Sequence, residues 1–194
     1  MTEPVAPGLR LEDILKQIDG QKFPPVDRWN PDFCGDIDMR IASDGTWFYM
    51  GTPITRERMV RLFSTVLRKD EDGKTYLVTP VEKIGITVDD APFVATRVDM
   101  LQGDAGKALK FTTNVGDEVI AGPEHCIRVE VNAETGEPRP YIHIRGRLEA
   151  LIARSVFYEL VDHARSVEKG GQTKLELESM GECFSLGTLE SEAG

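Results

Sequence analysis

Two stretches of this chain carry the same pattern of apolar residues, aligned without a gap. The first is WFYMGTPITRERMVRLFSTVLRK, residues 47–69, and the second is YIHIRGRLEALIARSVFYELVDH, residues 141–163. In both, a strand pattern leads into an amphipathic helix pattern, and a glycine-containing loop and two short strand patterns follow. This alignment constrains the fold more than composition does, because it indicates that one plan is used twice. We therefore expect an α+β fold with a duplicated strand-helix-strand plan.

The predicted first half, residues 31–88, begins with a hairpin. In GDIDMRIASDGTWFYMG, apolar and charged residues alternate, and SDG is a turn signal that sends the chain back. Thr55 can cap the next helix, because its side-chain oxygen can accept a hydrogen bond from a free backbone N–H group. We expect that helix over residues 55–68, with strands following at 75–79 and 84–88.

The predicted second half, residues 89–194, is larger and richer in strand. Alternation and turn signals predict strands over 93–101, 108–113, 117–121 and 126–131, a returning strand RPYIHIRG, a long helix over 148–164, and short strands over 173–178 and 183–186. Residues 1–30 precede both halves. There, the spacing of Leu11, Ile14, Leu15 and Ile18 predicts a short helix, and a proline-rich arm follows it.

Composition and charge exclude several classes of protein. The chain has 194 residues and a net charge of −10, so it should repel nucleic acid and anionic membrane surfaces. No apolar run is long enough to span a bilayer, and MTEPVAPGLR does not resemble a secretion signal. Cys34, Cys126 and Cys183 are few and scattered, which is typical of reduced thiols. We expect a cytoplasmic protein without a bound metal or cofactor.

The stretch RPYIHIRGR carries the clearest chemical signal. On a strand, Tyr141, His143 and Arg145 share one face, and Arg154 follows close by in the sequence. Guanidinium groups suit phosphate or carboxylate, and a tyrosine ring can stack on a base. The pattern therefore indicates an anion site. The alternative is a solvated sheet face whose arginines pair with surface carboxylates.

Glu82 and Lys83 stand side by side at the start of the strand that joins the two halves. Neighbours on a strand point to opposite faces, so one of these charges should face the protein and need a partner. Lys83 could then meet a ligand phosphate, while Glu82 could pair with Arg145 or Arg56. Alternatively, both are exposed charges at the start of a strand.

Other motifs are better explained by structure than by chemistry. Asp89 and Asp90 precede Ala91 and Pro92, and such a cluster belongs to turns more often than to metal sites. The neighbouring pair HC at residues 125–126 has no second ligand pair. No glycine-rich phosphate loop and no nucleophile elbow occurs.

The segments DGTWFYMGTPITRERMVRLFSTVLRKDEDGKTYLVTPVEKIGITVDDAPFVAT and PYIHIRGRLEALIARSVFYELV resemble an uncharacterised proteobacterial family, domain of unknown function 1285. The resemblance extends from about residue 24 to residue 190. It implies a small first half packed on a larger β-rich half that is like a pleckstrin-homology barrel with a helix. It also implies a pocket between the halves that suits a nucleotide-like molecule, and a role in signal transduction. It brings no enzymatic activity with it.

Three functions remain open at this stage. We expect a non-enzymatic protein that binds a small anionic, nucleotide-like ligand between its halves through Arg56, Glu82, Lys83, Tyr141, His143, Arg145 and Arg154. The first alternative is an adaptor that docks a signalling protein or a second copy of this chain. The second is a small enzyme that uses Glu82 or His143 as a general base on an anionic metabolite.

Overall fold

The structure, a computed structural model, describes residues 23–103 and 106–189. The chain divides into two compact units, which are described here one at a time. The first unit runs to Pro92 and takes in Gly146–Leu148, and the second holds the remaining residues. The helix predicted from Leu11 to Ile18 lies outside the described residues.

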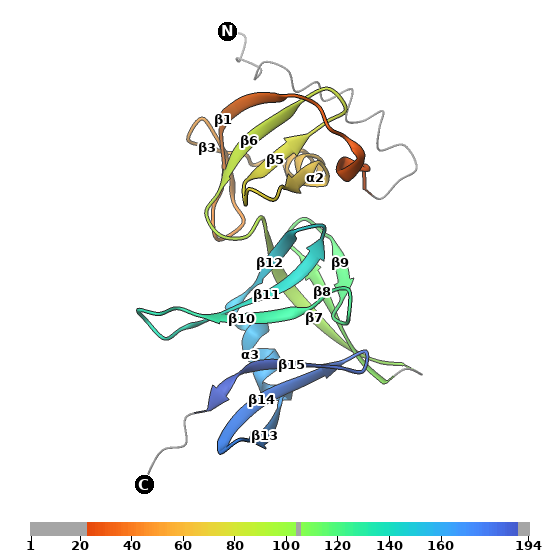
Figure 1. Ribbon diagram of the computed structural model, residues 1–194, viewed down its shortest axis with the longest axis vertical. Helices are drawn as coiled ribbons and strands as arrows, with labels where there is room; N and C mark the ends of the chain where they lie inside the picture. Colours follow the sequence, from red (N-terminus) through yellow and green to blue (C-terminus); the bar gives the residue numbers. More distant parts are fainter. Residues whose placement is uncertain (1–22, 104–105, 190–194) are drawn as a thin grey trace. The chain divides into compact units, whose positions relative to one another are not determined.

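The first unit is built on one six-stranded sheet with the order β3-β2-β1-β6-β5-β4 (Figure 1). A short 3-10 helix, η1 (Val26–Arg28), precedes it. The strands are β1 (Phe33–Ile41), β2 (Trp47–Tyr49), β3 (Thr52–Pro53), β4 (Leu67–Lys69), β5 (Thr75–Val78) and β6 (Lys83–Val88). All neighbours are antiparallel except β1 and β6, which run parallel.

The predicted hairpin of β1 and β2 is present. Met39 and Ile41 face the core while Asp38 and Arg40 are exposed, as the alternation requires. In the turn, Asp44 Oδ1 accepts a hydrogen bond from the Thr46 N–H group at 2.9 Å. The turn returns the chain so that Trp47 lies opposite Ile41.

One helix, α2 (Glu57–Thr65), follows β3 and packs on this sheet through an aromatic contact. Phe63 stacks on Trp47 with ring centroids 6.3 Å apart. The helix is shorter than predicted at both ends. Arg56 occupies the N-cap position without a side-chain cap, and Leu67 has left the helix to pair with Leu77 in β5. Pairing with a neighbouring strand therefore overrides the helical pattern at residues 67–68.

The second unit holds two sheets and one helix, α3 (Arg154–His163). The first sheet has the order β10-β11-β12-β7-β8-β9, and the second has the order β13-β14-β15. Their strands are β7 (Phe93–Gly103), β8 (Gly106–Thr113), β9 (Glu118–Ile120), β10 (Ile127–Val131), β11 (Pro138–Arg145), β12 (Leu148–Ile152), β13 (Arg165–Lys169), β14 (Gln172–Ser179) and β15 (Glu182–Leu189). The helix contacts β7 and β14, so it lies between the two sheets (Figure 1).

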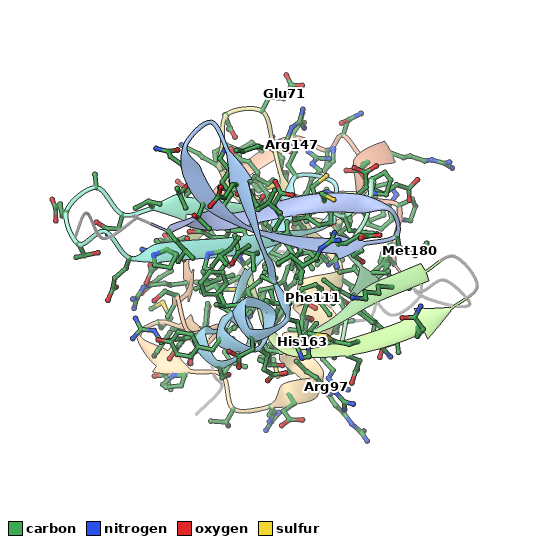
Figure 2. All side chains as sticks on the ribbon, turned by 90° about the horizontal axis from the view of Figure 1, so that it is seen from below. Glu71, Arg97, Phe111, Arg147, His163 and Met180 are labelled. Carbon is green, nitrogen blue, oxygen red and sulfur yellow. The ribbon has the colours of Figure 1, made fainter. Side chains whose placement is uncertain are left out.

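The two sheets of the second unit meet where β14 ends. Ser179 is fully buried there, and its hydroxyl donates to the Ala121 carbonyl at 2.7 Å while accepting from the Leu109 N–H group at 2.9 Å. The next N–H group, of Met180, donates to the Lys107 carbonyl at 2.8 Å. The β14–β15 turn consequently lies against β8, and Figure 2 shows Met180 beside the β7–β8 hairpin.

The predicted long helix over residues 148–164 is wrong in its first third. Leu148, Ala150 and Ile152 are buried while the residues between them are less so, which is the period of a strand. This strand, β12, pairs in parallel with β7, and α3 starts only after Ala153. The apolar spacing alone fitted both structures, because Leu148, Leu151 and Ile152 also suit a helix.

The predicted α+β fold with a duplicated strand-helix-strand plan is also wrong. Among the described residues there are fifteen strands in three sheets and only two α-helices, so the fold is mostly β. The strands after α2 join the sheet that precedes the helix, whereas the strands after α3 form a separate three-stranded sheet. The pleckstrin-homology-like barrel expected for the second half is likewise replaced by two separate sheets.

Candidate functional site

The cationic strand predicted for anion binding is β11, and its predicted site residue Arg145 is already paired. Arg145 Nη1 donates to Asp117 Oδ2 at 2.6 Å, and both side chains are mostly buried. The guanidinium carbon also lies 5.0 Å from the centre of the Phe93 ring. Tyr141 is buried, and Arg128 covers its ring at 4.3 Å. These contacts stabilise the second unit and leave the Tyr141 ring covered rather than open for stacking.

His143, the third residue on this face of β11, stacks on His125, which is not among the predicted site residues. The rings of His125 and His143 stack with centroids 5.5 Å apart. His125 Nδ1 donates to the His143 carbonyl at 3.0 Å, and His143 Nδ1 donates to the Glu124 carbonyl at 2.8 Å. Because a carbonyl can only accept, both rings carry a proton on Nδ1. The pair fastens the loop before β10 onto β11.

The only sequence signal for this pair was indirect. His125 follows a turn of the type Gly-Pro-Glu and precedes β10, which is antiparallel to β11. Strand order alone would have placed it near His143, but the register was needed to bring the rings together.

Lys83 forms an ion pair with a carboxylate of the first unit instead of being available to a ligand. Its Nζ lies 2.9 Å from Asp70 Oδ2 and 4.4 Å from the centre of the Tyr76 ring. Arg68 binds the same carboxylate at 2.6 Å and also donates to the carbonyls of Val26 and Trp29. The network therefore ties η1, β4 and β6 together within the first unit.

The pKa values in this network follow from its contacts. Partial burial raises the pKa of Asp70, but hydrogen bonds from Arg68 and Lys83 outweigh burial and hold it below its ordinary value. Tyr76 donates its hydroxyl to Asp72 at 2.6 Å, and this bond raises the pKa of Tyr76 to about 12. Lys83 therefore already has a counter-charge in Asp70.

Glu82 closes the turn before β6 through its backbone. Its N–H group donates to Thr79 Oγ1 at 3.1 Å, and its carbonyl accepts from the Thr79 N–H group at 2.9 Å. The side-chain atom Oε2 is buried and has no hydrogen-bond partner among the described residues. The expected pairing of Glu82 with Arg56 is not formed among the described residues, and Arg145 pairs with Asp117. The expected site shared by both halves stays a prediction.

Arg154 begins α3 and lies at the surface. Its side chain is exposed and approaches Glu137 Oε1 at 3.5 Å, and Glu137 is exposed as well. Exposed pairs of this kind contribute little to stability.

Arg56 differs from the other predicted cations. It is exposed at the N-cap of α2, and the exposed residues Arg58 and Arg61 follow on the same helix. Within the described chain, none of these three arginines forms a hydrogen bond or ion pair through its side chain. Arg58 and Arg61 are three residues apart and are neighbours on one side of the helix, so we call these two the arginine face of α2, and Arg56 precedes them at the N-cap. The sequence prediction included Arg56 but not Arg58 and Arg61, because the strongest cationic pattern in the sequence is that of β11.

Among residues 23–103 and 106–189, no group of three or more acidic, histidine or cysteine side chains is arranged to hold a metal ion. No helix in the described ranges is long and apolar enough to cross a membrane. The cysteines Cys34, Cys126 and Cys183 are free and exposed.

Comparison with known proteins places the chain in a family. Residues 24–91 match the N-terminal domain, and residues 92–186 the C-terminal domain, of a family described as domain of unknown function DUF1285. The chain belongs to the DUF1285 family. The boundary between the two DUF1285 domains, after residue 91, lies one residue from the division between the two units after Pro92. No curated protein matches the chain.

Two solved structures of DUF1285 proteins are similar to this one. The protein from Silicibacter pomeroyi DSS-3 is 54% identical, with 87% of this chain and 90% of that chain covered and a TM-score of 0.80. The protein from Shewanella baltica OS155 is 23% identical, with 64% and 90% covered and a TM-score of 0.48, too distant to support an argument. The similarity to the Silicibacter pomeroyi protein therefore covers both units.

Proposed function

We propose that this protein is a non-enzymatic binding protein that takes up an anionic, nucleotide-like ligand through the arginine face of α2. The observation that carries the proposal is the contrast among the predicted cations. Lys83, Arg145 and Arg154 each lie within 3.5 Å of a carboxylate oxygen, whereas Arg56 and its neighbours are exposed and unpaired in the described chain. The proposed role in signal transduction rests on the family resemblance alone.

The chemistry of the arginine face supports this assignment. A guanidinium group is planar, stays charged at all physiological pH values and donates two parallel hydrogen bonds to a phosphate. Arg58 and Arg61 are three residues apart on a helix, so their side chains lie on neighbouring positions of one face. Two guanidinium groups at that spacing can hold a diphosphate, in a chain whose net charge of −10 keeps anions away elsewhere.

Calorimetric titration with inorganic pyrophosphate and with adenosine triphosphate tests the proposal. We expect both probes to bind the native chain, and the double substitution Arg58→Ala with Arg61→Ala to weaken binding at least about tenfold, since one charge-assisted hydrogen bond contributes roughly 1.5–3 kcal/mol. Raising the salt concentration should weaken binding as well, because exposed charges are screened.

Arg28→Ala is the matched control. Arg28 is an exposed arginine of η1 in the same unit, so its loss changes the net charge by the same amount per residue without touching α2. Affinity should stay within about twofold of the native value, a difference of roughly 0.4 kcal/mol. If neither probe binds, or if Arg28→Ala weakens binding as much as the change in α2, the arginine face is not a specific site.

A further inference from the structure

In the second unit, the hairpin of β7 and β8 extends beyond β12, the strand that pairs with the other side of β7 (Figure 1). β12 pairs with β7 at residues 93–95, and the Ala153 N–H group then donates to the Ala95 carbonyl at 3.0 Å. β8, by contrast, pairs with β7 as far as Gly103. Within the described chain, the side of β7 that faces away from β8 therefore has no strand partner after residue 95.

The backbone groups on that side of β7 follow from the register. Residues opposite each other in an antiparallel pair either bond to each other or both point away. Leu109 lies opposite Met100, and its carbonyl accepts from the N–H group that follows β9 at 2.9 Å. Lys107 lies opposite Gln102, and its carbonyl accepts from the Met180 N–H group at 2.8 Å. Met100 and Gln102 consequently turn their own N–H and C=O groups away from β8.

The accessible part of this side is residues 99–103, DMLQG, because Val98 before it is buried. We call these residues the open edge of β7. Met100 is 40% exposed and Leu101 is 43% exposed. Neighbours on a strand point to opposite faces, so an exposed apolar side chain flanks the open backbone on each face. A strand added here would cover both side chains.

The other sheet edges of the described chain are better protected. An unpaired edge can pair with another chain, and proteins block it with short strands, charges or proline. β3 has two residues and ends in Pro53, and β4 and β9 have three residues each. β13 carries Arg165, Glu168 and Lys169, and β10 and β15 contact each other. The open edge of β7 is longer than β3, β4 and β9 and has one charged residue, Asp99.

We propose that two copies of this chain pair through their open edges of β7, antiparallel about a two-fold axis, so that one sheet continues from copy to copy. Leu101 is the middle residue of the open edge, so pairing over its full length places Leu101 opposite Leu101 of the second copy. Met100 then lies opposite Gln102 of the second copy. Both residues direct their backbone groups toward the other copy, so each such pair exchanges two N–H···O bonds.

Charge and burial favour this one register, and a second copy as the occupant. With the axis at Leu101, Asp99 lies opposite Gly103 of the second copy and no carboxylates meet. An axis at Asp99 would place two carboxylates opposite each other, which destabilises a strand pair. An axis at Met100 would require the buried Val98 to pair with Gln102. The inference does not involve the arginine face of α2, so it holds or fails independently of the proposed function.

Covalent trapping tests the inference, since an interface of a few residues belongs to the transient class. Cys34, Cys126 and Cys183 are first replaced by serine, because these thiols are free and exposed. In that background, Leu101→Cys places two cysteines opposite each other with Cα atoms about 4.5 Å apart, within the range of a disulfide. In a buffer of oxidised and reduced glutathione, we expect a covalent dimer, measured by intact mass spectrometry.

Two controls use the same cysteine-free background. Ile120→Cys matches Leu101→Cys in exposure, because Ile120 is 40% exposed, but it lies on β9, away from the open edge. Asp99→Cys lies on the open edge, but its counterpart in the second copy is about 13 Å further along the strand, too far for a disulfide. Each control should form at least about tenfold less covalent dimer than Leu101→Cys.

Sedimentation equilibrium of the native chain measures the association without a crosslink. Leu101→Lys should weaken it at least about tenfold, because like charges directly opposite each other repel. Ile120→Lys makes the same change in charge on the same sheet and should leave the association within about twofold of the native value.

Three results would overturn the inference. Equal amounts of covalent dimer from Leu101→Cys and Ile120→Cys would show collision without a specific contact. More dimer from Asp99→Cys than from Leu101→Cys would exclude the proposed register. A native chain that stays monomeric at millimolar concentration would leave the open edge to solvent or to a strand of another protein.

Discussion

At the scale of single residues, the turn of Met180 and Gly181 gives the clearest test of backbone strain. Met180, with a φ of 53°, begins the two-residue loop between Ser179 and Glu182. Asparagine tolerates this conformation better than methionine, because its short polar side chain can bond locally. We expect Met180→Asn to raise the free energy of unfolding by about 0.5–1 kcal/mol. Urea unfolding measures this, and a loss of stability would show that the methionine side chain stabilises the unit.

Asp70 gives a pH-dependent prediction. Its folded pKa lies below the ordinary value of 3.8, so its contribution to stability is present above that pH and is lost as pH falls through the folded pKa. Asp70→Asn should lower the free energy of unfolding by about 1–2 kcal/mol at pH 7. The difference from the native chain should be similar at pH 5 and smaller at pH 3. A difference that grows toward acid pH would contradict the assignment.

The candidate residues show which contacts could be predicted from the sequence and which could not. The alternation of β11 correctly placed Tyr141, His143 and Arg145 on one face. It could not show that Asp117 neutralises Arg145, because that carboxylate lies 28 residues away in the sequence. Lys83 and Asp70 are separated by 13 residues, and the register of β5 and β6 decides their contact. Ion pairs across strands depend on register, which composition and periodicity do not supply.

At the scale of elements, short-range signals predicted hairpins well and helix limits poorly. The SDG turn fixed β1 and β2, since a two-stranded unit is determined by its own turn. Residues 67–69 and 148–152 have helical spacing but pair as strands β4 and β12 with β5 and β7. Strand β13 was missed because its five residues are mostly exposed and charged, without an apolar alternation. Tertiary pairing decided these segments, not local preference.

The junction between the two sheets of the second unit depends on one hydroxyl. Ser179 Oγ satisfies both the Ala121 carbonyl and the Leu109 N–H group where β14 reaches β8. Ser179→Ala leaves two buried backbone groups without that partner, so we expect a loss of about 1–3 kcal/mol in the free energy of unfolding. Ser185→Ala is the control, because Ser185 is exposed on β15. Equal effects of the two substitutions would show that the junction is not stabilised in this way.

At the scale of the whole molecule, charge and exposure together direct the functional proposals. The chain carries 33 acidic and 23 basic residues, and most of its arginines with known contacts are bound to carboxylates. Within residues 23–103 and 106–189, Arg58 and Arg61 are two neighbouring arginines of one helix without an ion pair, and this is visible only when the ion pairs are known. The sequence predicted an anion ligand near Lys83 and Arg145. Because both of these residues are paired with carboxylates, we propose α2 as the site instead.

The division at Pro92 leads to a prediction about how the molecule unfolds. Leu77 in β5 and Leu160 in α3 are both fully buried, one in each unit. Each unit has its own sheets, so a cavity in one should open that unit first. Leu77→Ala should remove about 2–5 kcal/mol of stability and raise amide hydrogen exchange in β1, β5 and β6. Exchange in β13, β14 and β15 should change little, and Leu160→Ala should give the reverse pattern. Mass spectrometry of deuterium uptake measures both, and a uniform rise over all three sheets would show that the two units unfold together.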